Sequence, residues 1–120
     1  MGDYRLAEVE ARFAQIVWEH EPINSTELVR LCAEELGWKK STTYTVLKKL
    51  CARGIFRNEQ AVVSAVLTKE EFESEKSRSF VEDSFGGSLP SFLTAFMGKR
   101  KLSEKQAEEI KRLIDSYREE

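Results

Sequence analysis

Hydrophobic residues recur at helical spacing through the first twenty positions of the chain. They fall three or four residues apart, or at sums of these steps, and so line one face of a helix. This pattern predicts an amphipathic helix over residues 7–20, which Pro22 ends because proline cannot continue a helix. The apolar stripe consists of Leu6, Val9, Phe13, Ile16 and Val17.

A second helix is predicted after Pro22. Asn24 followed three residues later by Glu27 resembles a capping box, with Asn24 as the N-cap. Gly37 closes the helix, because glycine is favoured just past a helix C-terminus. The residues expected on its apolar face are Leu28, Leu31, Cys32 and Leu36.

A third helix is predicted within residues 40–53. Ser41 is a candidate N-cap and Gly54 a candidate stop. Trp38 lies between the second and third helices and is expected to anchor one to the other. Three helices joined by short turns are typical of a helix-turn-helix unit. The narrow apolar stripe of the third helix consists of Val46, Leu47 and Leu50.

A run rich in β-branched residues follows the third helix. Residues 61–67 are too few for a helix, and we expect them to pair with residues 55–57 as a hairpin. A hairpin directly after the third helix is a wing. The prediction is therefore a mainly α fold with a small β-hairpin wing, in which residues 1–68 form a winged-helix DNA-binding domain.

Residues 69–120 are predicted to form three more helices. Thr68 with Glu71 and Ser103 with Gln106 are capping-box patterns, and Gly86 begins a Gly-Gly break. Helices this short bury their aromatic residues poorly alone, so we expect a helical dimerisation domain in a symmetric homodimer. Packing back onto the winged helix in a monomer is the alternative. The expected interface residues are Phe72, Phe80, Phe85, Leu89, Phe92, Leu93, Phe96, Ile110, Leu113, Ile114 and Tyr117.

Charge is unevenly distributed along the chain. The net charge is −2, but residues 38–57 hold six basic residues and no acidic ones. A basic window of this kind is the pattern expected of an element that contacts DNA, although a solvated basic helix face is the plainer interpretation. Hydroxyls and cations on one helix face suit the major groove and its phosphates. The candidate DNA-binding residues are Lys39, Lys40, Ser41, Thr42, Thr43, Tyr44, Thr45, Lys48, Lys49 and Arg57.

Composition argues against several other classes of protein. A single histidine, two separated cysteines and no Gly-rich phosphate loop leave little from which to build a catalytic or metal site, so we expect no enzyme activity, metal or cofactor. Cys32 and Cys51 are expected to be reduced and buried. No apolar run approaches 18 residues and no signal-peptide pattern opens the chain, so we expect a cytoplasmic protein without membrane insertion.

The chain resembles the penicillinase-repressor (BlaI/MecI/CopY) family along nearly its whole length. The third-helix segment Ser41-Thr42-Thr43-Tyr44-Thr45-Val46-Leu47-Lys48-Lys49-Leu50, followed by Arg53-Gly54, is the most similar stretch. Further matching segments are Leu6-Ala7-Glu8-Val9-Glu10, Ile16-Val17-Trp18, Ile23-Asn24-Ser25-Thr26-Glu27-Leu28, Gly87-Ser88-Leu89-Pro90-Ser91-Phe92 and Leu102-Ser103.

The resemblance implies a dimeric transcriptional repressor that binds a dyad operator in double-stranded DNA. It places Ser41, Thr42 and Tyr44 near base edges and Lys49 near phosphate. It also implies derepression by a membrane sensor protease within the dimerising region, at the matching bond Ala95–Phe96. The copper-responsive branch of the family ends in a cysteine-rich tail, which this sequence lacks.

Two alternatives remain open at this point. A winged helix also serves as a protein-interaction adaptor, although an adaptor has no need of clustered cations on its third helix. A repressor released by a small-molecule effector between the two regions fits the same sequence.

Overall fold

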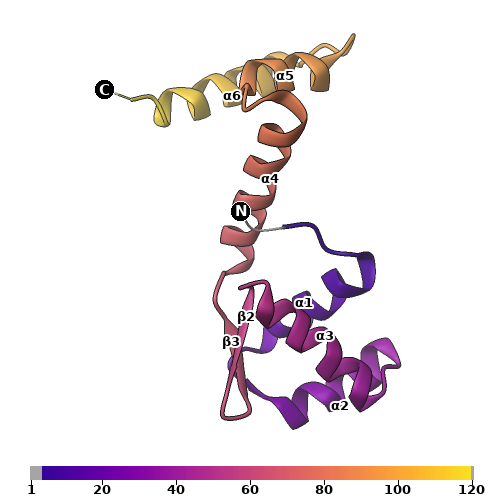
Figure 1. Cartoon of the computed structure of the whole chain (residues 1–120). Coiled ribbons are helices and arrows are strands. Elements are labelled where there is room, and N and C mark those ends of the chain that lie inside the picture. Colours follow the sequence, from indigo (N-terminus) through magenta and orange to yellow (C-terminus); the bar gives the residue numbers. More distant parts are fainter. Residues whose placement is uncertain (1–3, 120) are drawn as a thin grey trace.

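The computed structural model describes residues 4–119 and shows a head of three helices and a small sheet, from which one long helix leads to two further helices (Figure 1). The predicted fold class, mainly α with a small β wing, is confirmed. The elements are α1 (Glu8–His20), β1 (Ile23–Asn24), α2 (Ser25–Leu36), α3 (Lys40–Ala52), β2 (Phe56–Glu59), β3 (Val62–Ala65), α4 (Lys69–Phe85), α5 (Leu89–Met97) and α6 (Glu104–Ser116).

The hydrophobic core lies where α1, α2, α3 and the sheet meet. Phe13 stands at its centre: its ring stacks on Trp38 at a centroid distance of 5.7 Å and meets Phe56 edge-on at 6.3 Å. Trp38 thus anchors the segment before α3 onto α1. The α1 stripe differs from the prediction at one place, because Val9 is 50% exposed and Glu10 faces the core instead.

The helix ends of the head are set by local hydrogen bonds. Asn24 caps α2 as predicted, accepting from the Thr26 backbone N–H at 2.9 Å. Glu27 does not complete a capping box, because its carboxylate bonds to Arg30 instead. The N-cap of α3 is Lys39 rather than Ser41, which lies within the first turn and makes no capping bond. A left-handed Gly37 ends α2, as expected.

The wing belongs to a three-stranded antiparallel sheet of order β1-β3-β2. The hairpin β2–β3 was predicted, whereas the third strand, β1, was not: two residues are too few to show an alternating pattern. At the hairpin turn, Gln60 and Ala61 have φ values of 53° and 65°, a region that L-residues disfavour. The Ala61 carbonyl accepts from the Ser25 backbone N–H at 2.8 Å, which ties the turn to the start of α2.

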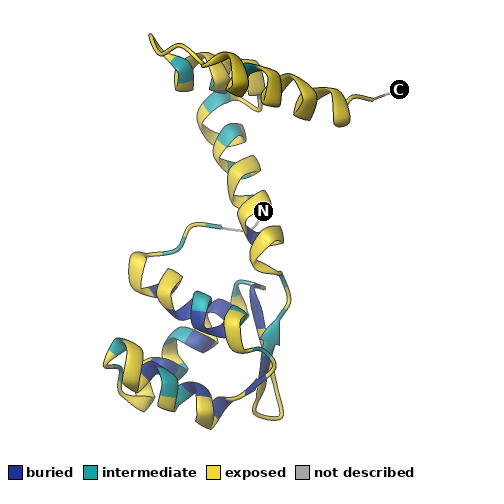
Figure 2. Ribbon diagram, turned by 180° about the vertical axis from the view of Figure 1, so that it is seen from behind, coloured by how far each residue is buried: buried dark blue, intermediate teal, exposed yellow. Residues whose placement is uncertain are grey.

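Helix α4 begins on the head and then leaves it. Thr68 and Glu71 form the predicted capping box, with backbone-to-side-chain bonds of 2.8 and 3.0 Å. Phe72, one turn into the helix, is 2% exposed and belongs to the core of the head. We had expected Phe72 at the dimer interface, but its ring is already covered by the same chain. No residue of α4 after Phe72 is buried (Figure 2).

The C-terminal helices expose most of their apolar surface (Figure 2). No residue of α5 or α6 is buried in the described part of the chain, and Phe96 and Leu113 are 60% and 58% exposed. The Ser103–Gln106 capping box of α6 is present as predicted. An aromatic cluster lies at the junction of α4 and α5, with neighbouring ring centroids 5.6–6.1 Å apart. Its members are Phe80, Phe85, Phe92 and Phe96.

The strained turn of the wing generates a stability prediction. Replacing Gln60-Ala61 by Asn-Gly should raise the free energy of unfolding by about 1 kcal/mol, because both new residues adopt positive φ more readily. Urea unfolding measures the change. As a control, Ala33→Gly at an exposed interior position of α2 should lower the free energy of unfolding by about 1 kcal/mol. A double turn variant no more stable than the wild type would contradict the prediction.

Candidate nucleic-acid interface

The outward face of α3 presents short hydroxyl side chains and cations. The helix packs on α2 and β2 through Thr43, Leu47 and Leu50, which are buried at steps of three and four residues. This packing leaves Ser41, Thr42, Thr45, Lys48 and the preceding Lys39 and Lys40 exposed on the remaining surface. Threonine methyls, hydroxyls and ammonium groups on one helix face can contact base edges and phosphates in a major groove.

The six cations of the basic window divide into two sets. Lys39, Lys40 and Lys48 are exposed and form no ion pair within residues 4–119. The other three lie beside carboxylates: Lys49 and Arg53 at Glu10, and Arg57 at Glu59, where the N–O distance is 3.6 Å. Three cations per chain are therefore available for phosphates without breaking a contact.

A buried carboxylate, that of Glu10, holds the C-terminal half of α3. Glu10 is 8% exposed, and its Oε2 accepts from Lys49 Nζ at 2.5 Å. Its other oxygen accepts from the Ala7 backbone N–H at 2.9 Å and lies 4.0 Å from Arg53 Nη1. The hydrogen bond from Lys49, followed by that from Ala7, holds the pKa of the Glu10 carboxyl below its usual range. The carboxylate is therefore ionised at neutral pH and fixes α3 against α1.

A second polar contact holds the N-terminal half of α3. The Tyr44 hydroxyl, on a half-buried side chain, donates to Ser25 Oγ at 3.0 Å, and Ser25 is buried at the start of α2. Thr43 is buried, and its hydroxyl donates to the Lys39 carbonyl at 3.2 Å. The Tyr44 bond therefore joins α3 to α2, the Thr43 bond lies within the first turn of α3, and neither side chain belongs to the freely exposed face.

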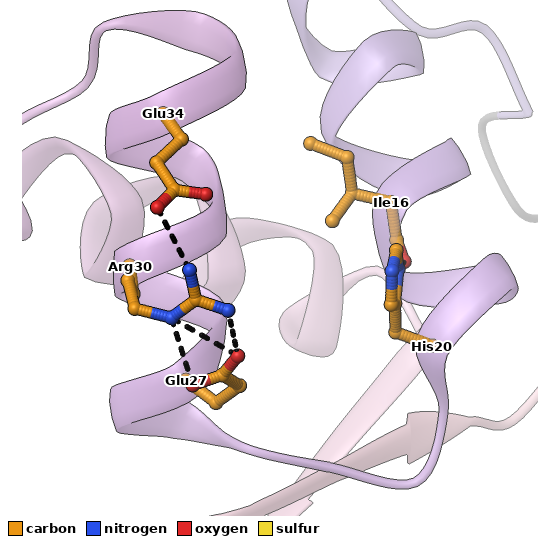
Figure 3. Close-up of polar contacts among 5 residues, drawn as sticks. All are labelled: Ile16, His20, Glu27, Arg30 and Glu34. Carbon is orange, nitrogen blue, oxygen red and sulfur yellow. Dashed lines mark hydrogen bonds and ion pairs between the residues drawn. The ribbon is translucent and has the colours of Figure 1, made fainter.

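The outer face of α2 carries a cation that is neutralised in place (Figure 3). Arg30 donates to Glu27 Oε2 from Nε at 3.0 Å and to Glu34 Oε1 from Nη1 at 2.8 Å. These bonds lower the pKa of Glu27 and raise that of Arg30. The α2 face thus adds no net positive charge beside α3.

On the neighbouring α1, also drawn in Figure 3, His20 Nδ1 lies 2.9 Å from the Ile16 carbonyl oxygen.

Other kinds of site find little support in the described chain. Within residues 4–119 no three His, Cys, Asp or Glu side chains gather closely enough to hold a metal ion. No helix among them has the length and hydrophobicity that crossing a membrane requires. Both cysteines are free thiols, and burial raises the pKa of Cys32 to about 11. That pKa leaves Cys32 protonated and unreactive at neutral pH.

The structure gathers most of the residues predicted to contact DNA on one surface. Six of them, from Lys39 to Lys48, surround the exposed face of α3, while Thr43, Tyr44 and Lys49 make intramolecular bonds and Arg57 lies on β2. Sequence reasoning missed Glu10 and Ser25. A signal for Glu10 was present, since it lies three residues before Phe13 and seven before Val17, on the apolar face of α1.

Comparison with known proteins identifies relatives along almost the full chain. Residues 6–116 match the family model described as Penicillinase repressor. The penicillinase repressor of Bacillus licheniformis is 23% identical over 118 residues, covering 95% of this chain and 92% of the relative. The methicillin resistance regulatory protein MecI of Staphylococcus aureus (strain Mu50 / ATCC 700699) is 18% identical over 116 residues, covering 93% and 94% of the two chains.

The buried carboxylate generates a prediction on pH dependence. Glu10→Gln should lower the free energy of unfolding at pH 7 by about 1–3 kcal/mol, because a charged partner of Lys49 is lost. The pKa of Glu10 is lower in the folded state, so the stabilisation exists above its ordinary value of 4.5 and is lost as pH falls through the folded-state pKa. Urea unfolding of both proteins from pH 7 to pH 3 should show the difference shrinking below that value. A difference independent of pH would contradict an electrostatic role.

Proposed function

The chain belongs to the penicillinase repressor family, and we propose that it is a transcriptional repressor that binds a dyad operator as a homodimer. The observation that carries this proposal is the exposed face of α3, where hydroxyls and free cations meet on a helix held in its N-terminal half by Tyr44 and in its C-terminal half by Glu10. A rigidly held helix with such a face suits the reading of a major groove.

The proposed base contacts come from the first half of α3. Ser41, Thr42 and Thr45 are exposed and short, so the helix backbone can approach the bases closely. Their hydroxyls suit base-edge acceptors, and the threonine methyls suit thymine methyls. The resemblance to the family placed Tyr44 among these contacts. We instead assign it to orienting α3, because its hydroxyl is bonded to Ser25.

The proposed phosphate contacts come from Lys39, Lys40 and Lys48. Three cations from each of two chains neutralise about six phosphates, which corresponds to a log–log salt slope of about −5. Lys49 was expected among these contacts, but its ammonium group is 2.5 Å from Glu10 and so is already compensated. The rest of the chain is acidic on balance, so binding depends on this local cluster.

The proposed dimer is supported by the apolar surface of α4–α6. The α6 stripe of Ile110, Leu113, Ile114 and Tyr117 is exposed in the single chain. An open groove of about 1380 Å³ lies between the N-terminal segment, α4 and α5, and its lining includes Phe80, Phe92 and Phe96. The groove is open and its exposed aromatic lining continues the apolar surface of α5, so it suits helices of a second copy better than an effector.

Release by proteolysis is the finer part of the proposal and rests on the resemblance to the family. The matching bond, Ala95–Phe96, lies in α5, and both side chains are exposed. Cleavage there separates α6 from α4 and so divides the apolar surface that we assign to the dimer. A membrane sensor protease would be the partner in this step.

The primary test is binding to DNA upstream of the gene that encodes this chain. Fluorescence anisotropy across a salt series, against a scrambled duplex of equal length, should show tight binding to the upstream DNA at two chains per site. Equal weak binding to both duplexes would contradict an autoregulatory repressor.

A pair of lysine variants tests the assignment of phosphate contacts. Lys48→Ala should reduce the magnitude of the salt slope by about two, one for each chain of the dimer. Each lost cation leaves one phosphate un-neutralised, so binding releases fewer counterions from the DNA. Lys49→Ala, the matched neighbour, loses the contact that holds α3 to α1 and so lowers affinity, but it should leave the slope unchanged because the charge of Lys49 is compensated by Glu10. Equal changes in slope for the two variants would refute the distinction.

A threonine variant tests base reading. Thr42→Ala should weaken binding to the operator by about 1–3 kcal/mol and leave binding to random duplex DNA unchanged. Anisotropy titrations of the two duplexes at one salt concentration measure both effects. An equal loss on the operator and on random DNA would rule out a base-reading role for Thr42.

A pair of α6 variants tests the dimer. Leu113→Glu places a charge on the apolar stripe and should raise the dimer dissociation constant by about 100-fold or more, since a buried unpaired carboxylate costs several kcal/mol. Arg112→Glu introduces the same side chain at an adjacent position on the polar side of the helix and should have a much smaller effect. Sedimentation equilibrium measures both constants. Unchanged association of Leu113→Glu would exclude this face from the interface.

A further inference from the structure

Phe72 is the one buried residue of α4, and its aromatic ring attaches the helix to the head. Phe72 lies between Trp18, whose ring centroid is 5.6 Å away, and Tyr4, which meets it edge-on at 6.0 Å. The Trp18 indole Nε1 also donates to the Leu67 carbonyl at 3.0 Å, in the segment just before α4. The base of α4 is therefore fixed in position, and the helix is not joined to the head by a free hinge.

The contacts of Phe72 continue through the head to the start of α3. Trp18 meets Phe56 at 5.5 Å, Phe56 meets Phe13 at 6.3 Å, and Phe13 stacks on Trp38 at 5.7 Å. Trp38 immediately precedes Lys39, the N-cap of α3. A continuous series of packed rings thus runs from the base of α4 to the start of α3.

The N-terminal segment forms a second connection between the same two helices. Tyr4 covers Phe72 of α4, and the adjacent Arg5 carbonyl accepts from Arg53 Nη2 at 2.6 Å, just past the end of α3. Three residues after Tyr4, the Ala7 backbone N–H donates to Glu10, which also binds Lys49 of α3. The orientation of α4 and that of α3 are therefore set together.

A small change of angle at Phe72 has a large effect at the far end of α4. The helix extends about 20 Å from Phe72 to Phe85, at about 1.5 Å per residue. A tilt of about 10° moves one end by about 3.5 Å, close to the rise of about 3.4 Å per base pair. Inserting one base pair between two half-sites shifts them by this distance and rotates them by about 35°, so the dimer accepts it only if its joints can twist as well as tilt.

We infer that Phe72, seated between Tyr4 and Trp18, determines which spacing between operator half-sites the dimer accepts. The inference rests on the dimeric, operator-binding function proposed above. Phe72 and Tyr4 touch no base or phosphate in this proposal, and they act as positioning residues. A rigid joint at Phe72 excludes operators one base pair too long or too short, and a loosened joint accepts them.

The test measures spacing preference in the intact chain. Operators are first selected from random duplexes by retention on the wild-type protein, and their centres are then lengthened or shortened by one base pair. Dissociation constants are measured by anisotropy for the wild type, Tyr4→Ala and Phe72→Leu. Val9→Ala, which removes an exposed apolar side chain on α1 outside the joint, is the control. Circular dichroism checks that each variant is folded. If Phe72→Leu does not fold, the result for Tyr4→Ala alone decides the test.

We define the spacing ratio as the dissociation constant for an operator altered by one base pair divided by that for the selected operator. For the wild type we expect a spacing ratio of about ten, and for the two joint variants a ratio at least about threefold smaller. Affinity of the joint variants for the selected operator should change by less than about threefold, and Val9→Ala should keep the wild-type spacing ratio. A wild type indifferent to spacing, or joint variants that keep its ratio, would overturn the inference. A wild-type protein that retains no operator at all would overturn the proposed function and the inference with it.

Discussion

Helix α3 packs on one side and remains open on the other, and the rest of the head is arranged around this constraint. Only Thr43, Leu47 and Leu50 of α3 are buried, which is too narrow a stripe to fix the rotation of a helix by itself. Polar contacts supply what the stripe lacks. Tyr44, in the N-terminal half of α3, binds α2, and Lys49, in the C-terminal half, binds Glu10 of α1. Both neighbouring helices therefore hold α3 at defined points.

Local patterns in the sequence were sufficient to predict most of the helices. Apolar spacing, glycine stops and capping boxes act between residues a few positions apart, so α1, α2 and the caps of α4 and α6 could be read directly. The N-cap of α3 could not, because Lys39 makes no capping bond and Ser41 offered a better side chain. The strand β1 has no periodic signal and forms only because β3 lies beside it.

The candidate site was predicted as a set of residues but not as an arrangement. A run of cations on α3 is visible in the sequence, whereas the compensation of Lys49 by Glu10 joins residues 39 positions apart. Phe72 shares α4 with the exposed Phe80, and its different role depends on the positions of Tyr4 and Trp18 in the folded head. Long-range contacts of this kind follow from tertiary packing, which a local pattern does not encode.

The unburied surface of α5 and α6 has a consequence for dosage. If these helices pair as proposed, the form that occupies DNA arises from an association equilibrium. Below the dissociation constant, its concentration rises with the square of the chain concentration. Halving the supply of chains then leaves about a quarter of the dimer. Synthesis and turnover would therefore control the regulated promoter more steeply than any change in DNA affinity of the same size.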